Sequence, residues 1–407
     1  MTPRKRSVIA VALVAQTVAI GTTIGSFTLF VQPIAAEFEA TRFQVSLGIS
    51  FMTAMLGIGG VFIGPVLDRG RIRRVMLIGC SVQVASLLVA SVANDLLILG
   101  ALALVVGFAM PTLGPVTSSA LVGKVFDEDR GRALGIVNMG APLGGLVFAL
   151  IAGVTLETWG WRGTYVLFAA IAASTTLPCV MWLVPAPADL LASVPTGGAS
   201  AGESATGPRR AGELFRNPVF ICSALPFGIL IGCATGWSAH LAPYLDGLGG
   251  STRMVALTVA VSMGMGMMGT LVFGVLVERF SPRSLLFSML AITSIGFLVL
   301  STQPSLGVAV PTVVLAGLCA GGFLPVFVSL LADRFGTASL GRTMGLSNAF
   351  ILPFGFAVPP SLGAIYDSQG GYTLAFFLLI GLYAVAAIAL SRLRAAPSGA
   401  REAGESA

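Results

Sequence analysis

The chain alternates long apolar runs with short polar interruptions. Runs long enough to cross a bilayer, which takes about 20 residues, lie at residues 8–32, 43–67, 75–93, 96–122, 133–156 and 163–184. A second set lies at residues 217–242, 254–277, 285–302, 307–331, 343–366 and 371–391. The runs are continuous and do not alternate at every second residue, so we expect helices and not the strands of an outer-membrane barrel. The pattern predicts an all-α integral membrane protein with twelve transmembrane helices in two sets of six.

Composition supports this class. Of 407 residues, 56% are hydrophobic and 10% are charged, whereas about a quarter of the residues of an ordinary soluble domain are charged. We also expect every charged residue to lie in a loop or at a helix end, with none near the middle of the membrane.

The distribution of basic residues predicts the orientation. With the N-terminus inside, the inner loops and tails hold 20 of the 23 Lys and Arg residues, and only Arg42, Arg162 and Arg253 lie outside. This asymmetry indicates a multi-pass protein of the cell inner (plasma) membrane with both termini in the cytoplasm. The net charge of +6 is therefore a signal of topology, and no nucleic-acid partner is expected.

An internal repeat relates the two sets of helices. An offset of 210 residues carries Gly64, Asp68, Arg69, Arg132 and Asn138 onto Gly274, Glu278, Arg279, Arg342 and Asn348. Both halves begin on the same side of the membrane, so they are parallel repeats. We predict an N-terminal half at 1–184, a cytoplasmic linker rich in Pro, Ala, Gly and Ser at 185–216, and a C-terminal half at 217–407.

The charged motifs of this repeat resemble those of a known family. Asp68-Arg69 and Glu278-Arg279 each follow a glycine four residues before the acid and precede further basic residues. Twelve helices with G-x-x-x-[DE]-R after helices 2 and 8 resemble the major facilitator superfamily of secondary transporters, and the likeness covers nearly the whole chain. In the first copy Gly70 follows Arg69 directly, which departs from the usual spacing.

The resemblance implies a gate on the cytoplasmic side. In that family the acid faces the N-terminus of a helix in the other half, which would place Asp68 near Arg342 and Glu278 near Arg132. A carboxylate at a helix N-terminus is stabilised by about 0.3–2 kcal/mol, enough to shift a conformational equilibrium. The expected gate consists of Asp68, Arg69, Arg132, Glu278, Arg279 and Arg342.

Glycines indicate which helices pack across the two halves. Helix 5 carries glycines at spacings of four over residues 131–153, and helix 8 carries Gly266 and Gly274. Small residues at this spacing let helix backbones approach closely. The resemblance implies that helix 5 packs against helix 8 across the two halves, and these glycines fit such a contact; static packing is the alternative role for each of them.

The resemblance also implies a central substrate cavity lined by helices 1, 4, 7 and 10. At about 100° per residue, polar or aromatic side chains gather on one face of each of these helices. The candidates are Gln16, Thr23 and Ser26 on helix 1, Thr112 and Ser119 on helix 4, Cys233, Trp237 and His240 on helix 7, and Phe323 and Phe327 on helix 10. The intramembrane amides Asn138 and Asn348 complete the set. Helix–helix hydrogen bonding or packing is the alternative role for each of these side chains.

The cargo is inferred from a narrower likeness. The segment Gly355–Tyr372 resembles the helix 11–12 junction of the monocarboxylate porter and oxalate/formate antiporter group, through Pro359, Pro360, Gly363 and Asp367. Helix 8, however, lacks the Arg that those carriers use to hold a carboxylate. We expect transport of a small, monocarboxylate-like metabolite by alternating access. Proton-coupled efflux of a hydrophobic compound is an alternative, and a receptor that uses this fold without solute flux is an alternative of another class.

Other chemistry is not expected. One histidine, scattered cysteines at 80, 179, 222, 233 and 319, and the absence of midplane carboxylates offer no metal site, cofactor site or catalytic set, so we do not expect an enzyme. No Gly-Lys-Ser/Thr phosphate loop is present to use ATP. The expected partners are a small-molecule substrate and the lipid bilayer, with the protein acting as a monomer. Proton coupling stays open, with His240 as the candidate carrier.

Cysteine labelling in intact cells tests the topology. In a chain whose native cysteines are replaced, Ser200→Cys should be protected from an impermeant reagent added outside, because residue 200 lies in the predicted cytoplasmic linker. Ser368→Cys should react. Labelling of position 200 from outside would contradict the predicted orientation.

The gate is tested with Asp68→Asn. Loss of the carboxylate should weaken the cytoplasmic contact and shift the carrier toward inward-open states, lowering transport at near-normal abundance. Distances measured across the cytoplasmic face should lengthen in the variant, and unchanged distances would refute the proposed contact.

Overall fold

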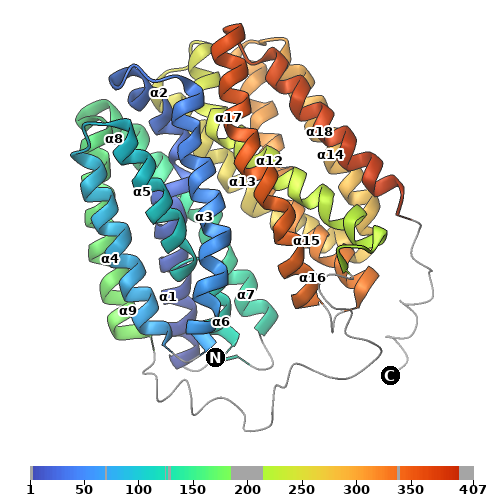
Figure 1. The fold of residues 1–407 in the computed structure, drawn as a ribbon, viewed down its shortest axis with the longest axis horizontal. Coiled ribbons are helices and arrows are strands. Elements are labelled where there is room, and N and C mark those ends of the chain that lie inside the picture. The colour runs from blue at the N-terminus through green and yellow to red at the C-terminus, as the bar shows by residue number, and fades with distance from the viewer. Residues whose placement is uncertain are drawn as a thin grey trace.

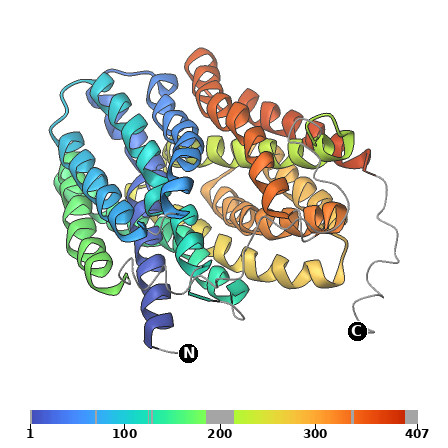
Figure 2. The same ribbon diagram turned by 60° about the horizontal axis from the view of Figure 1, so that its bottom comes forward.

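The structure is a computed structural model, and it describes residues 3–68, 71–123, 125–126, 130–184, 214–336 and 340–393. These residues form helices and connecting turns without a β-strand. They fall into two helical bundles that lie side by side (Figures 1 and 2). Residues 185–213, most of the predicted linker, lie outside the described part of the chain.

The first bundle contains the helices before residue 184. They are α1 (Pro3–Ile20), α2 (Phe27–Glu37), α3 (Arg42–Asp68), α4 (Ile72–Ser91), α5 (Leu96–Ala109), α6 (Pro115–Gly123), α7 (Arg130–Asn138), α8 (Gly140–Ile171) and α9 (Leu177–Leu183). The second bundle contains α12 (Pro218–Gly247), α13 (Thr252–Arg279), α14 (Pro282–Ser301), α15 (Leu306–Phe335), α16 (Leu340–Ser347), α17 (Ile351–Gln369) and α18 (Thr373–Ser391).

Twelve membrane crossings follow from these helices. Within the described residues, 11 helical stretches are long and apolar enough to cross a membrane. One of them, Ala133–Leu183, has 51 residues, or about 77 Å at 1.5 Å per residue, more than twice the thickness of the hydrocarbon core. This stretch turns back at Gly160, whose φ of 65° and ψ of −176° are accessible to glycine alone. It therefore crosses twice, and the prediction of twelve transmembrane helices is confirmed.

Local sequence signals explain where many helices begin and end. The side chains of Asp95, Asn217 and Ser281 accept hydrogen bonds from backbone N–H groups in the first turns of α5, α12 and α14, which otherwise lack partners. Gly336 and Gly370, with φ of 77° and 68°, end α15 and α17. Several helices extend past the apolar runs, since the first crossing reaches Glu37 and α12 reaches Gly247. Hydropathy locates the membrane core, whereas these capping residues set the helix ends.

The first crossing is broken in its middle. Between α1 and α2, residues Gly21–Gly25 form a π-helical turn, and Thr23 has non-helical dihedral angles (φ −124°, ψ −105°). A π turn holds an extra residue, so the side chains after it are rotated by about 100° from the positions that a continuous helix would give them. The break therefore changes which side chains of the first crossing face the second bundle.

The two bundles meet along three helix pairs. The first half of α8 packs against α13, as the family resemblance implied, α3 packs against α17, and α2 packs against α12, where the Ala242 N–H donates to the Thr28 hydroxyl oxygen at 2.8 Å.

Backbones come close in the α3–α17 pair, where a Cβ at Gly363 would lie 2.7 Å from the Phe43 backbone N, so a side chain larger than hydrogen is excluded there. In the α8–α13 pair, a Cβ at Gly145 would lie 2.8 Å from the Cγ of the Met263 side chain.

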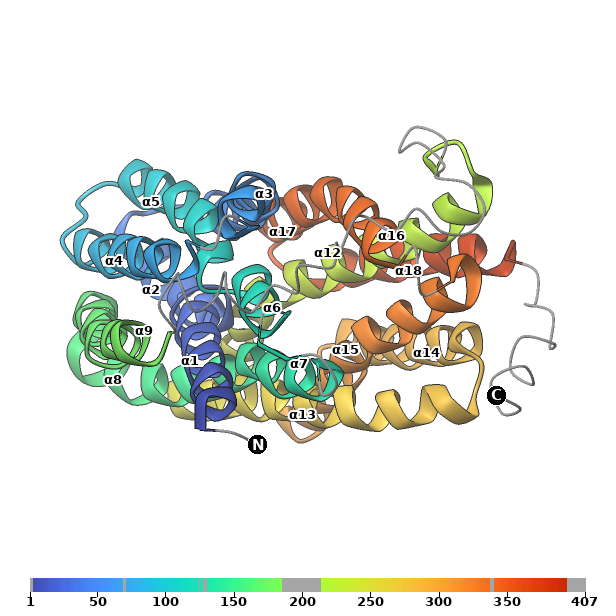
Figure 3. The same ribbon diagram turned by 90° about the horizontal axis from the view of Figure 1, so that it is seen from below.

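The bundles are in contact at one end and diverge toward the other. We call the end formed by residues 38–41, 92–95, 157–162, 248–251 and 370–372 the far end, and the opposite end, near Pro3 and Ile72, the N-terminal end. In Figure 1 the ribbons of the two bundles converge at the far end and separate toward the N-terminal end. Figure 3, a view from below, shows the short helices α6 and α7 of the first bundle on the side that faces α15 of the second bundle.

Candidate functional site

A cavity of about 510 Å³ lies between the two bundles. The N-terminal bundle contributes side chains from α1, from the broken segment after it and from the α7–α8 junction, and the C-terminal bundle contributes α12 to α15 and α18. Four of the predicted residues line it: Gln16, Asn138, Trp237 and Phe323. Among the described residues that surround the cavity, none is charged.

The cavity walls carry polar groups that lack partners among the residues that the structure describes. Gln16 is 1% exposed, and its Oε1 accepts no hydrogen bond from any residue that the structure describes. The Trp237 indole N–H and the Tyr383 hydroxyl also form no hydrogen bond with a described residue, although both side chains line the cavity. A buried polar group without a partner is unfavourable by about 1–3 kcal/mol. The cavity is therefore suited to a solute that both donates and accepts hydrogen bonds.

Aromatic rings hold one wall of the cavity in place. The Trp237 ring lies 5.7 Å from Phe297, 5.4 Å from Phe376 and 5.7 Å from Tyr244, measured between ring centroids. Such edge-to-face and tilted contacts restrict the orientation of each ring. Phe297 lines the cavity beside Trp237, which gives an apolar surface next to the polar groups of Gln16 and Tyr383.

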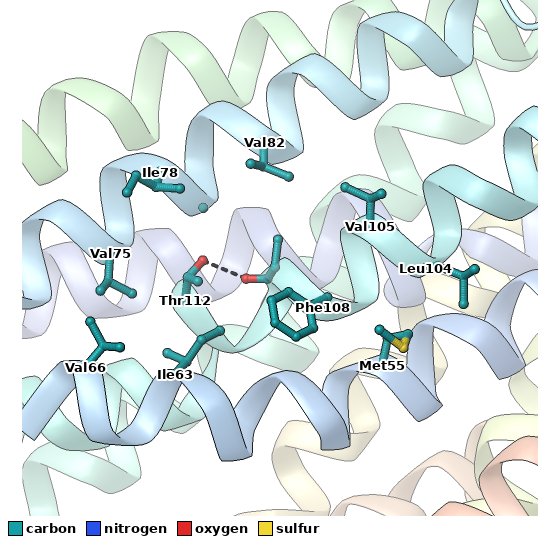
Figure 4. Close-up of a pocket in the computed structure, with 12 residues that line it drawn as sticks. Met55, Ile63, Val66, Val75, Ile78, Val82, Leu104, Val105, Phe108 and Thr112 are labelled. Atoms are coloured by element: carbon teal, nitrogen blue, oxygen red, sulfur yellow. Dashed lines mark hydrogen bonds between the residues drawn. The ribbon is translucent and has the colours of Figure 1, made fainter.

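Other predicted residues lie away from this cavity. Thr23 and Ser26 line a separate cavity inside the N-terminal bundle, because the π turn rotates them away from the face of Gln16. Thr112 lines an apolar pocket between α3, α4 and α5, where its hydroxyl donates to the Ala109 carbonyl oxygen at 2.6 Å (Figure 4). Figure 4 shows aliphatic side chains such as Ile63 around it.

Predicted cavity residues of the second bundle, too, lie partly outside the central cavity. Cys233 is completely buried within α12. Phe327 stacks on Phe227 with ring centroids 3.9 Å apart and thus packs inside its own bundle. Asn348 is exposed at the start of a 3-10 turn, and Asn138 ends α7, so the repeat places the two amides at corresponding helix breaks. The side chain of Ser119 lies outside the described part of the chain.

His240 is buried at the far end and belongs to a hydrogen-bonded chain. Its Nε2 lies 2.9 Å from the Pro359 carbonyl oxygen, and its Nδ1 lies 3.0 Å from the Tyr372 hydroxyl. A carbonyl only accepts, so Nε2 carries the hydrogen and Nδ1 accepts from Tyr372. Tyr372 accepts in turn from the Arg42 guanidinium at 2.6 Å. Burial raises the pKa of the Tyr372 hydroxyl, which therefore stays protonated and able to donate. Both ring nitrogens of His240 are thus used within the protein.

The chain of hydrogen bonds that contains His240 ends at Arg42, where a carboxylate of the second bundle caps the N-terminus of α3 in the first bundle. The Asp367 carboxylate of α17 accepts from the backbone N–H of Arg42 at 3.0 Å and from that of Phe43 at 2.9 Å. These N–H groups open α3, so Asp367 caps a helix of the other bundle and meets the positive end of its dipole. The Arg42 guanidinium lies 3.5 Å from the centre of the Tyr366 ring, a cation–π contact. We call Arg42, Asp367 and Tyr372 the far-end latch.

A second contact is related to this latch by the repeat. Arg253 at the start of α13 donates to Glu157 of α8 at 3.0 Å. An offset of 210 carries Glu157 onto Asp367 and Phe43 onto Arg253. The side chain of Arg253 is 73% exposed, so this ion pair contributes less than about 1 kcal/mol. The sequence signal for both contacts is the repeat itself, which relates these far-end residues as it relates the cytoplasmic motifs and the two asparagines.

Most residues of the predicted cytoplasmic gate lie outside the described part of the chain. Arg69 and the side chains of Asp68, Arg132 and Arg342 are outside the described part of the chain. Glu278 and Arg279 end α13 with exposed side chains. The gate therefore stays a prediction.

A twelve-helix membrane protein with a cavity between two repeated halves has the architecture of a secondary transporter. The sequence matches the Major Facilitator Superfamily over residues 11–301 and over 241–407, and the chain belongs to this family. It is 25% identical over 373 residues to an uncharacterized MFS-type transporter of Bacillus subtilis, YcxA, covering 88% of this chain and 89% of that protein. It is 30% identical over 326 residues to human monocarboxylate transporter 11, covering 75% of this chain and 65% of the relative.

The fold is also that of solved transporters. A bacterial homolog of the human lysosomal transporter Spinster, in an inward-facing and unoccupied conformation, superposes with a TM-score of 0.74 at 18% identity. The match covers 96% of this chain and 97% of the other.

The far-end latch is tested with Asp367→Asn. An amide has one acceptor oxygen where the carboxylate has two, and it lacks the charge that favours the helix N-terminus. Loss of about 1 kcal/mol at this cap should raise the population of far-end-open molecules about fivefold. Spin labels on the exposed far-end residues Asn94 and Thr302, one in each bundle, should report more of the longer distance.

Glu157→Gln is the matched control. It removes the corresponding but more exposed ion pair, so its shift should be smaller. A shift in the control that equals or exceeds that of Asp367→Asn would contradict the assignment of the latch.

Proposed function

We propose that this protein is a secondary transporter that carries a small monocarboxylate-like metabolite in its neutral, protonated form. The observation that carries the proposal is the buried Gln16 Oε1, which lacks a donor among the described residues of an otherwise uncharged cavity. A protonated acid brings an O–H group that can donate to this oxygen. A carboxylate has no such hydrogen.

The electrostatics of the cavity favour the neutral form. An ionised carboxylate transferred to a site without a cation loses its hydration and gains no opposite charge, which costs several kcal/mol. The carbonyl oxygen of a protonated acid can instead accept from the Trp237 N–H or the Tyr383 O–H. Both donors line the cavity and have no described partner.

Coupling to protons then follows from the cargo itself. Each acid molecule that crosses in its neutral form carries one proton with it, so no protein side chain has to change its protonation state. This agrees with the position of His240, whose two nitrogens are both hydrogen-bonded away from the cavity.

Similarity to a named carrier supports the substrate class. Human monocarboxylate transporter 11 matches three quarters of the chain, and the likeness of Gly355–Tyr372 to the monocarboxylate group points the same way. We place the protein in the cytoplasmic membrane as a monomer with both termini inside, which makes the separated end of the bundles the cytoplasmic one. The conformation is then inward-facing, like that of the Spinster homolog.

A second candidate function is efflux of an uncharged hydrophobic compound. The observation that favours it is the apolar part of the cavity, where Trp237, Phe297 and Phe323 lie near Met139 and Met263. Aromatic and methionine side chains adapt to varied apolar ligands. The need to satisfy the amide of Gln16 ranks this function below acid transport.

Uptake into proteoliposomes tests the proposal, with radiolabelled lactate as the probe. At a fixed total concentration, the initial rate should fall about tenfold for each pH unit above a carboxyl pKa near 4, because only the protonated acid is carried. Lactamide is uncharged and has both an amide donor and a carbonyl acceptor. Its own charge does not change with pH. The lactamide concentration that halves the uptake rate should therefore be the same at every pH, provided that the concentration of protonated lactic acid is held constant.

Gln16→Leu should remove most of the uptake in the same assay. Gln83→Leu serves as a control for folding, because the Gln83 side chain is also buried but donates to the Thr22 hydroxyl and does not line the central cavity. Uptake that is independent of pH, or retained fully in Gln16→Leu, would overturn transport of the neutral acid. Lack of acid uptake together with stabilisation by lipophilic compounds would favour efflux.

A further inference from the structure

A second cavity, of about 680 Å³, lies inside the N-terminal bundle. It is enclosed by the broken segment after α1, by α2, α3, α4 and α5, and by Tyr165 of α8. The break in the first crossing separates the two cavities, because Gly25 lines the central one and Ser26 lines this one. The proposed transport function does not use it.

One side of this cavity carries hydroxyl groups without partners. Ser26 is 1% exposed, and its Oγ has no hydrogen-bond partner among the described residues. Ser86 and Tyr165, which line the same cavity, likewise make no hydrogen bond within the described part of the chain.

Neighbouring hydroxyls behave differently. Thr22 and Thr53 each donate to the carbonyl oxygen four residues earlier, both at 2.8 Å, which is the usual way for a helix to satisfy a hydroxyl group. Ser26 follows the non-helical Thr23, so this carbonyl is not presented to it. The break therefore leaves a buried hydroxyl that a ligand can satisfy.

Apart from Gln44 and the threonines Thr22 and Thr23, the rest of the wall is apolar and uncharged. Phe27, Phe30 and Leu87 line it, and Phe30 stacks on Tyr165 with ring centroids 4.5 Å apart. No charged side chain is found among its described lining residues. A ligand that fits is uncharged, mostly apolar, and carries one hydrogen-bonding group.

The bilayer is the source of such a ligand. Leu97 and Leu104 of α5 line the cavity and are 79% and 38% exposed, and the exposed surface of a transmembrane helix meets lipid. Gly100 lies between them and lines the cavity too. A molecule dissolved in the membrane therefore reaches the cavity beside α5 without passing through water.

We propose that this cavity is a binding site for a membrane-dissolved lipophilic alcohol or phenol. The hydroxyl of the ligand bonds with Ser26 and its neighbours, and its apolar body packs against Phe27, Phe30 and Leu87. A ligand in this position rests on the broken segment that also lines the central cavity, so it stabilises the broken conformation of the first crossing.

Photolabelling of the purified full chain in lipid nanodiscs tests the site, with a diazirine derivative of octan-1-ol as the probe. Peptides from the segment 21–30 and from α5 should carry most of the label, and excess octan-1-ol should displace it. Gly100→Leu fills the cavity where a Cβ has room, since its nearest neighbour would be a Phe51 ring carbon at 3.9 Å. The amount of saturable label on this variant should be lower than on the unchanged protein by a factor of at least about ten.

Gly57→Leu is the matched control, because a Cβ at Gly57 meets no atom within 4 Å and the residue does not line the cavity. Its labelling should equal that of the unchanged protein. Ser26→Ala should weaken competition by octan-1-ol about three- to tenfold, the loss of one hydrogen bond, without lowering the melting temperature, because no protein hydrogen bond is removed. Label spread evenly over lipid-facing helices, or unaffected by Gly100→Leu, would overturn the proposal, and the readout does not depend on transport of any acid.

Discussion

The exclusion of charge from the hydrocarbon core is the constraint on which the rest of this structure depends. An unpaired ion at the centre of a bilayer is unfavourable by several kcal/mol, and the two cavities accordingly have no charged residue among their described lining residues. Charges are placed at the rims, where Asp367 and Glu157 face α3 and α13 across the interface. Under the proposed function, recognition of cargo is thereby left to neutral hydrogen bonds and rings, while opening and closing are left to the charged ends.

The broken first crossing shows how backbone geometry divides these tasks. A continuous helix would present Gln16 and Ser26 on neighbouring faces, and both would reach the central cavity. The π turn at Gly21–Gly25 sends Gln16 to the space between the bundles and Ser26 into its own bundle. The glycines of this segment pack on Gly144 and Gly145 of α8, so the break is held by close helix contact and not by side-chain hydrogen bonds alone.

The sequence predicted the features that depend on hydropathy, charge and spacing. Twelve crossings and the repeat follow from these, and the packing of helix 5 on helix 8 agrees with what the family resemblance implied. Gln16, Asn138, Trp237 and Phe323 line the cavity between the bundles, and their contact with a substrate stays a prediction. Thr23, Ser26 and Thr112 lie away from this cavity, because regular rotation of 100° per residue does not foresee a π turn or a 3-10 turn. His240 lies away from it too, because its partners, Tyr372 and Pro359, are more than 100 residues away in sequence.

Under the proposed function, both the far-end latch and cargo binding are built from a small number of contacts. The latch consists of the Asp367 cap, the hydrogen bond from Arg42 to Tyr372 and the Arg42–Tyr366 cation–π contact, and cargo binding consists of a few neutral hydrogen bonds. A neutral acid makes two or three hydrogen bonds in the cavity, each worth about 0.5–1.5 kcal/mol net, and it brings no charge to neutralise. Cargo can shift the balance between open and closed states only by its differential affinity for them, which is limited to this range. A gate closed by a buried network of ion pairs would be too strong for such a cargo to influence. Two backbone N–H groups capped by Asp367, with the contacts of Arg42 and an exposed ion pair at Glu157, form a small set of contacts instead, and a carrier of neutral molecules can open it at each cycle.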